Sequence, residues 1–249
     1  MIRTLAIIAG AGLALSIVGI GGAAALGGAD IRAGHWNGSA WNWDMDGGWD
    51  HWDEDRRVPA GPQAQRTLDW TGGDRLTVDI PGSVVFVQGA PASVVAEGRQ
   101  DVLDSLTLTD GRLAFAEENS WRSLDDDDLR ITVTAPDVSR FELRGSGDLS
   151  IRGYDQPALA VSVAGSGDVD AAGRTDRVEA NVSGSGELDL EYLQAGDAQA
   201  SVAGSGDIDL TATGTVSAAV SGSGDVVLHG RPATMTSQVA GSGDIRVVD

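Results

Sequence analysis

The chain has 249 residues, 37 acidic and 17 basic side chains and a formal net charge of −20. Phosphate backbones and anionic lipid surfaces repel such a charge, so nucleic acid is excluded as a partner. Cysteine and lysine are both absent, which excludes disulfides, thiolate metal sites, Schiff-base chemistry and a Walker-type phosphate lysine.

The N-terminus carries an export signal. Residues 4–29 contain no charged side chain, and residues 5–26 are almost wholly apolar or small. As a helix, residues 5–26 would reach about 33 Å, enough for a hydrocarbon core of roughly 30 Å. Arg3 before this run and Asp30 after it place the remainder outside the cytoplasm. Residues 1–29 are therefore either a cleaved signal peptide or an anchor in the inner membrane through residues 5–26. Both alternatives deliver the rest to the periplasm or the cell surface.

Residues 30–65 are predicted to be a flexible linker. Five of the seven tryptophans fall within residues 35–55, among asparagine, glycine and aspartate, and no helical or strand period persists there. Such a segment is typical of a juxtamembrane linker. Two alternatives remain open. One is an interaction tail for another envelope protein. The other is a divalent-cation site, whose spacing matches no defined metal loop. Its ligands would be His35, Asp44, Asp46, Asp50, His51 and Asp53.

Residues 66–249 are predicted to form the folded domain, of which residues 66–137 are an irregular β lead-in. The alternating apolar segment 76–80 runs into residues 81–83, which we interpret as a degraded copy of the repeat motif that follows. In this alignment Val84 and Val85 replace the second glycine and the acid of the motif. Further strands are expected at residues 93–96, 106–109, 113–116 and 129–134. The acidic run 125–128 is expected to be a solvated loop.

Residues 138–249 contain a regular repeat. Gly-Ser-Gly followed by an acid occurs six times, and the first glycines are separated by 20, 19, 20, 18 and 19 residues. Apolar residues alternate with mostly polar ones on both sides of each motif, which indicates strand, glycine corner, strand. A meander or barrel and a solenoid both fit this pattern. The near-constant period and identical corners favour a solenoid, an all-β parallel β-helix of about six regular coils of 18–20 residues. The corner glycines are Gly145, Gly147, Gly165, Gly167, Gly184, Gly186, Gly204, Gly206, Gly222, Gly224, Gly241 and Gly243.

The repeated Gly-Ser-Gly-acid corners, preceded by Ala135-Pro136-Asp137-Val138, resemble the putative auto-transporter adhesin, head GIN domain family. The resemblance covers roughly residues 66–249. It implies a right-handed β-helix in a bacterial envelope protein, and the family label suggests adhesion.

The motif acids would lie ~5 Å apart if the corners stack, with a repulsion of about 1 kcal/mol per pair in water. Hydrogen bonds to the turn offset this if the acids are turn caps, and bound calcium, the one cofactor considered, offsets it otherwise. An acid/base catalytic role would need a distinct constellation of histidine, arginine and carboxylate, and none emerges. The motif acids are Asp148, Asp168, Glu187, Asp207, Asp225 and Asp244.

These observations predict a non-enzymatic, exported β-helix that acts as an adhesion or binding module for an envelope protein or a glycan. The first alternative is a homo-oligomeric scaffold that polymerises end to end, because the last repeat has no polar cap over its strand edges. The second is a carbohydrate-active enzyme that uses the motif acids as acid/base pairs.

Overall fold

The computed structural model describes residues 62–70, 73–116 and 129–248. The export signal, residues 30–61 of the predicted linker with its candidate cation ligands, and the acidic run 125–128 lie outside these residues. The last three residues of the predicted linker, 63–65, instead belong to the first strand of the fold. The described residues belong to a compact unit of residues 55–249. No helix among them is long and apolar enough to cross a membrane.

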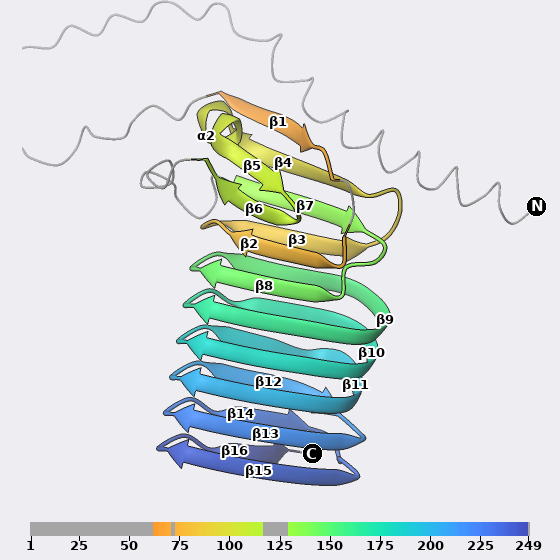
Figure 1. Cartoon of the computed structure of the whole chain (residues 1–249), viewed down its shortest axis with the longest axis vertical. Helices are drawn as coiled ribbons and strands as arrows, with labels where there is room; N and C mark the ends of the chain where they lie inside the picture. Colours follow the sequence, from red (N-terminus) through yellow and green to blue (C-terminus); the bar gives the residue numbers. More distant parts are fainter. Residues whose placement is uncertain (1–61, 71–72, 117–128, 249) are drawn as a thin grey trace, which may run out of the picture. The chain divides into compact units, whose positions relative to one another are not determined.

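The repeats form a β-solenoid of about five turns, which confirms the predicted fold class (Figure 1). The sequence estimate of about six coils counted the six corners, whereas the turns are the five intervals between them. Three long strands each run along one face, bend, and return along the other, where they pair in parallel with the strands of neighbouring turns. These strands are β9 (Asp148–Gly165), β10 (Val169–Gly184) and β11 (Glu187–Gly204). Equivalent residues of successive turns therefore lie above one another in columns.

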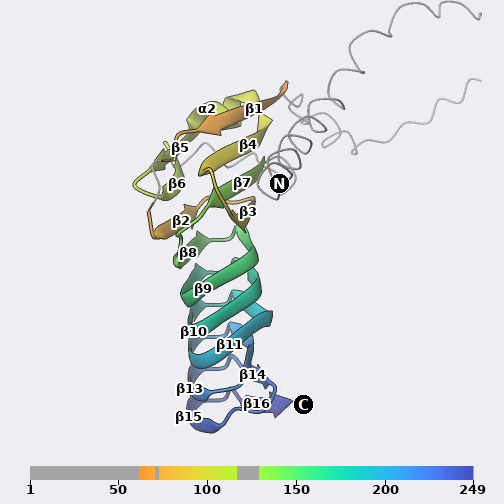
Figure 2. The same cartoon turned by 90° about the vertical axis from the view of Figure 1, so that its right-hand side faces the viewer.

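The two faces of the solenoid are defined by the corners. Face A holds the strands that end at a corner, and face B holds the strands that follow one (Figures 1 and 2). Beyond the long strands, the repeat strands of face A are β8 (Arg140–Gly145), β13 (Thr215–Gly222) and β15 (Thr234–Gly241). Those of face B are β12 (Asp207–Ala212), β14 (Val226–His229) and β16 (Ile245–Val248).

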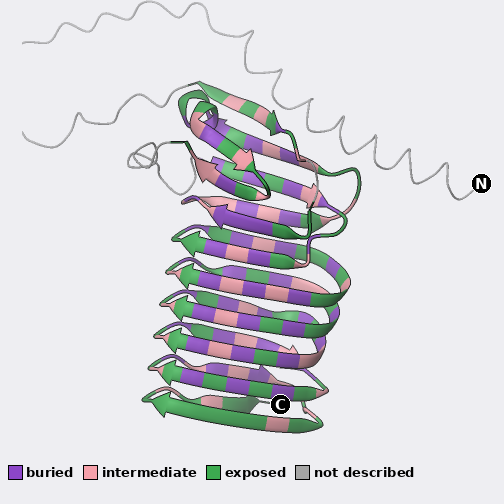
Figure 3. Cartoon of the chain, in the orientation of Figure 1, coloured by how far each residue is buried: buried purple, intermediate pink, exposed green. Residues whose placement is uncertain are grey.

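The core fills the space between the two faces. Its inward side chains come from every second residue of each strand, so buried and exposed positions alternate along the ribbon (Figure 3). Val163, Val182, Val202 and Val220 form one such column, and each is only 1–2 % exposed. Such columns account for the predicted alternation, because a repeat that cannot bury its apolar side chains alone buries them against its neighbours.

The N-terminal end is closed by antiparallel strands and a short helix. On face B, β1 (Gln63–Leu68) pairs with β4 (Ser93–Arg99), and β4 pairs with β7 (Leu129–Ala135), both antiparallel. On face A, β5 (Leu106–Thr109) is antiparallel to β6 (Arg112–Phe115). Helix α2 (Gln100–Ser105) connects the two faces and buries Val102 and Leu103. The strands expected at residues 93–96, 106–109, 113–116 and 129–134 are therefore confirmed as β4 to β7.

The first turn of the stack comes from β2 (Arg75–Asp79) and β3 (Ser83–Gln88), which pair in parallel with β8 and β9. The predicted alignment of this turn with the repeat motif is wrong by two residues. Ser83 pairs with Asp148, so Gly82 occupies the place of the second motif glycine, and its carbonyl accepts the Asp148 N–H at 3.0 Å. Glycine is favoured at this corner because the φ of Gly82 is +121° and a Cβ there would lie 3.3 Å from the Leu129 oxygen.

Candidate functional site

The corner glycines are required by the stacking of the turns. A Cβ on Gly206 would lie 2.2 Å from the Gly186 oxygen and 2.7 Å from Cγ1 of Val182. At Gly204 the backbone φ is +135°, and a Cβ would lie 2.2 Å from the Gly184 oxygen. No side chain fits at either position, and at Gly204 the positive φ favours glycine in addition. These glycines therefore shape the solenoid.

The motif serines and acids form a ridge along the corner edge, at the left in Figure 1. We call it the corner ridge. The Asp168 carboxylate accepts the backbone N–H of Glu187 at 3.0 Å. Asp207 accepts the N–H of Asp225 at 2.7 Å, and Asp225 accepts that of Asp244 at 2.8 Å. Each bond joins two consecutive turns, which supports the interpretation of the acids as turn caps.

Glu187 is the exception along the corner ridge. The N–H of Asp207, which lies one turn further on, donates to the Gly186 carbonyl at 3.3 Å instead of to a carboxylate. Burial, and then the charges of Asp168, Asp209, Asp189 and Asp207, raise the pKa of Glu187 above its ordinary value. The longer side chain of Glu187 thus leaves this turn with a weaker cap, and its carboxylate lies among other negative charges.

Three acids of the corner ridge, Asp148, Asp168 and Glu187, border a shallow depression of about 350 Å³ together with Asp170 and Asp189. Ser150 donates to the Asp170 carboxylate at 2.8 Å. Among the described residues, no group of three or more histidine, aspartate or glutamate side chains is arranged to hold a metal ion. Calcium binding by the motif acids stays a prediction.

A polar groove lies at the opposite edge, where face B passes back to face A. We call it the connection groove. Its volume is about 630 Å³, and side chains from consecutive turns line it. The lining residues are Asp155, Gln156, Pro157, Arg174, Thr175, Asp176, Gln194, Ala195, Gly196, Thr211 and Thr213. None of them belongs to the repeat motif, which is why sequence reasoning missed the groove. The only signal was the change in repeat length from 18 to 20 residues.

Some groove side chains are fixed by hydrogen bonds. Arg174 binds Asp155 through two bonds of 2.8 and 2.7 Å. The hydrogen bond from Arg174, with its charge, holds the pKa of Asp155 below the ordinary value. Thr175 is buried and donates to the Arg177 carbonyl at 3.0 Å. Thr211 donates to the Glu191 carbonyl at 2.7 Å.

Other polar side chains of the groove are available to a ligand. Within the described residues, the side chains of Asp176, Gln194 and Thr213 make no hydrogen bond or ion pair, and all three are exposed. Tyr192, two residues before Gln194, is 70 % exposed. The groove therefore presents a carboxylate, an amide and a hydroxyl, with an aromatic ring nearby in the chain.

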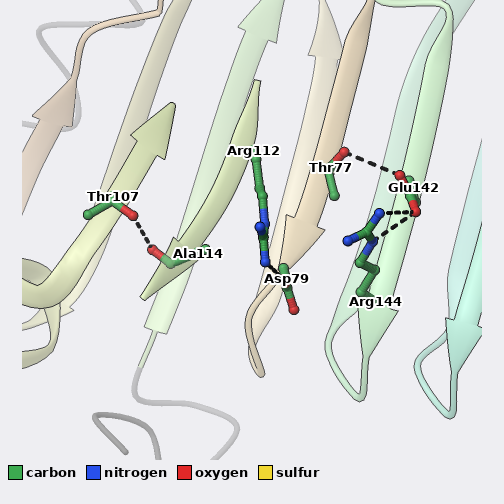
Figure 4. A network of polar contacts seen from close by, with 7 residues as sticks. All are labelled: Thr77, Asp79, Thr107, Arg112, Ala114, Glu142 and Arg144. Atoms are coloured by element: carbon green, nitrogen blue, oxygen red, sulfur yellow. Dashed lines mark hydrogen bonds and ion pairs between the residues drawn. The ribbon is translucent and has the colours of Figure 1, made fainter. Parts of the chain in front are cut away.

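A third polar cluster joins the lead-in to the regular repeats on the outer side of face A (Figure 4). Arg112 of β6 forms an ion pair with Asp79 of β2. Arg144 of β8 pairs with Glu142 at 2.7 Å, and Thr77 of β2 donates to Glu142 at 3.5 Å. The Arg112–Asp79 pair joins β6 to β2 and the Thr77–Glu142 bond joins β2 to β8, whereas the Arg144–Glu142 pair lies within β8.

Catalytic groupings are not seen in the part of the chain that the structure describes. His229, at the end of β14, is the one histidine in this part, and its Nε2 lies 3.4 Å from Asp209. The motif acids do not converge on it as acid/base pairs.

Stacked turns with glycine-constrained corners place the chain among the β-solenoid repeat proteins. The chain belongs to the putative auto-transporter adhesin, head GIN domain family, whose model matches residues 74–232. The match confirms the resemblance that the corner motifs indicate in the sequence. The family label names an adhesin and no catalytic activity.

The chain is similar to several solved structures, and the first of those named here shares its fold. A putative adhesin from Bacteroides fragilis is 21% identical with a TM-score of 0.62, and the match covers 76% of this chain and 99% of that one. A putative lipid binding protein from Parabacteroides distasonis is also 21% identical, with a TM-score of 0.49 and coverage of 76% and 98%. A putative adhesin from Parabacteroides merdae is 12% identical, with a TM-score of 0.49 and coverage of 76% and 97%. Comparison with curated proteins finds no match.

Proposed function

We propose that this chain is a non-enzymatic binding module, exported to the periplasm or the cell surface, that holds a neutral glycan in the connection groove. The observation that carries the proposal is the set of three unbonded polar side chains in a groove of about 630 Å³. Small-molecule sites typically have volumes of about 300–1,000 Å³ and a few convergent polar groups.

The chemistry of the groove favours a sugar. Asp176 and Gln194 offer acceptors and donors in the combination that hydroxyl groups require. Tyr192 does not line the groove, but it is two residues from Gln194 in the chain, and its exposed ring is an apolar surface with a polar tip of the kind that suits the face of a sugar ring. A net charge of −20 repels acidic polysaccharides, so the ligand should be neutral.

Export is supported by the apolar segment at residues 5–26 and by the adhesin family label. The absence of a catalytic role is supported by the motif acids, several of which are occupied in hydrogen bonds to the backbone of the next turn. A carbohydrate-active enzyme would instead require a free carboxylate pair beside the bound sugar.

The test is binding of the full chain to an array of neutral and acidic glycans, followed by titration calorimetry on the best neutral ligand. Gln194→Ala should weaken binding about 2- to 10-fold, the effect of one hydrogen bond. Gln199→Ala is the matched control, because Gln199 is exposed on face A, outside the groove. Equal binding by both variants, or binding only to acidic glycans, contradicts the proposal. Release of shorter sugars during the incubation would instead indicate an enzyme.

A further inference from the structure

The C-terminal end of the solenoid leaves core positions uncovered. Val239 continues the column of Val163, Val182, Val202 and Val220, yet it is 45 % exposed where Val220 is 2 % exposed. Val247 of β16 is 48 % exposed, whereas Leu228, its neighbour in the previous turn, is 1 % exposed. The change is visible as the shift from purple to green in the last turn (Figure 3).

Of the two edge strands at this end, β15 carries none of the features that guard natural edges, whereas β16 carries one charge, Arg246. β15 (Thr234–Gly241) has eight residues with the sequence TMTSQVAG, without a charge or a proline. Charged residues, prolines and bulges normally prevent such an edge from pairing with another strand. The N-terminal end differs, because α2 and the antiparallel strands β1 and β5 cover its core. Head-to-tail stacking of copies is therefore disfavoured, because the covered N-terminal end offers no strand edge to the exposed C-terminal end. A scaffold that polymerises end to end would need both surfaces.

We propose that β15 pairs antiparallel with β15 of a second copy, giving a tail-to-tail dimer with a twofold axis normal to the faces. Inward residues stay inward when residues of equal parity oppose each other. Ser237 then lies opposite Ser237 of the second copy, and Met235 lies opposite its Val239. In this register the exposed inward residues of β15 in one copy cover those of β15 in the other.

Charge selects this orientation of the twofold axis. An axis along the strands would bring Asp244 of both corner ridges together, at a cost of about 1 kcal/mol in water for a pair at the ~5 Å spacing of adjacent strands. An axis normal to the faces puts the two ridges at opposite edges. The eight-residue β15 spans about 26 Å, roughly three Debye lengths at physiological salt. The repulsion is then largely screened.

The size of the end surface sets the strength of the dimer. A strand of about 26 Å and a separation of ~10 Å between the faces give roughly 260 Å² per copy. The total of about 520 Å² is well below the ~1,600 Å² of a standard stable interface. The dimer should therefore depend on concentration, with backbone hydrogen bonds along β15 providing most of its specificity.

Cysteine cross-linking tests the register directly, because the chain has no cysteine of its own. Directly opposed residues of antiparallel strands have Cα atoms about 4.5–5.5 Å apart, within the range for a disulfide. Full-length Ser237→Cys, oxidised across a concentration series, should form a covalent dimer. Ser185→Cys is the control, because Ser185 is exposed on the corner ridge, away from this end. It should cross-link at least tenfold less at equal concentration.

Adding Val239→Lys to Ser237→Cys should reduce cross-linking at least tenfold, because it places an unpaired charge in the interface. Val239 is already exposed, so the melting temperature should not change, and this is measured in parallel. Equal cross-linking of Ser237→Cys and Ser185→Cys, no cross-linking at any concentration, or insensitivity to Val239→Lys each overturns the proposal. None of these results bears on glycan binding, because the connection groove does not include β15.

Discussion

Replacing Gly206 by alanine should destabilise the solenoid by about 3–5 kcal/mol. The new Cβ would lie 2.2 Å from the Gly186 oxygen and 2.7 Å from Cγ1 of Val182. Relief requires the two turns to separate, which weakens the bonds from Gly206 N–H to the Gly184 carbonyl at 3.1 Å and from Asp207 N–H to the Gly186 carbonyl at 3.3 Å. Overpacking costs about 1–3 kcal/mol, and each weakened hydrogen bond costs about 1 kcal/mol. The melting temperature should fall by roughly 6–20 °C.

Two controls separate close approach from the other effects of the substitution. Gly145→Ala tests backbone strain alone, because φ is +90° and nothing lies within 4 Å of the added Cβ; it should cost about 1–3 kcal/mol. Ser205→Ala, at the exposed residue between the two glycines, should change stability by less than about 0.5 kcal/mol.

Unfolding is followed by circular dichroism with heat and urea. Hydrogen exchange of the turn amides is measured as well, because stacked repeats can open locally. If Gly206→Ala matches Ser205→Ala, the contact between turns does not explain the glycine. The φ of Gly206 is not among the positive ones, so the strain that Gly145→Ala measures cannot account for a loss of stability at Gly206.

Four smaller perturbations test the electrostatics and the core. Because burial and neighbouring acids raise the pKa of Glu187, Glu187→Gln should stabilise the fold at neutral pH by a few tenths of a kcal/mol; this gain should vanish as pH falls through the raised pKa towards 4.5, the ordinary value. Glu187→Asp should allow the new carboxylate to accept the Asp207 N–H, seen as slower exchange of that amide; unchanged exchange would contradict it. Arg174→Gln should return the pKa of Asp155 towards its ordinary value of 3.8, measured by NMR titration. The stability that this pair adds should be present above that value and disappear as pH falls through the lowered pKa, and a pH-independent difference would argue against the pair. Tyr154→Phe should cost about 1 kcal/mol in urea unfolding, because the buried ring then loses its bond to the Ala158 carbonyl.

The regular part of the fold could be predicted because close contacts between the backbones of stacked turns require the same residue types once per turn. Glycine at Gly204 and Gly206 and apolar residues at Val202 and Ile208 recur once per turn, and their period identifies the solenoid. The lead-in could not be aligned in the same way. Its corner contains a single glycine, Gly82, and the pairing of Ser83 with Asp148 comes from contacts between residues 65 positions apart, which no local pattern reveals.

The connection groove was not predictable for a related reason. Repetition predicts what every turn shares, whereas a binding site needs side chains that differ from turn to turn. The register of the stack shifts between Ala171 and Gly173 in the pairing of β10 with β9. A second shift lies between Leu190 and Gln194 in the pairing of β11 with β12. Both irregularities lie close to the groove in the chain, and they interrupt the column order there.

The corner ridge and the edge that holds the connection groove therefore have different roles: the first determines stability, and the second offers side chains that differ from turn to turn. At every corner glycine after Gly145, an added Cβ would lie 1.9–2.3 Å from the neighbouring backbone, which leaves no choice of residue there. This edge is therefore nearly identical in every turn and carries stability. At the connections, bulges absorb differences in repeat length and bring unlike side chains such as Asp176 and Gln194 into one groove. A solenoid of near-identical turns can acquire a unique site only where its repetition is broken. For this reason we expect substitutions at the connection edge to change ligand binding with little effect on stability, and substitutions of the corner glycines to do the reverse.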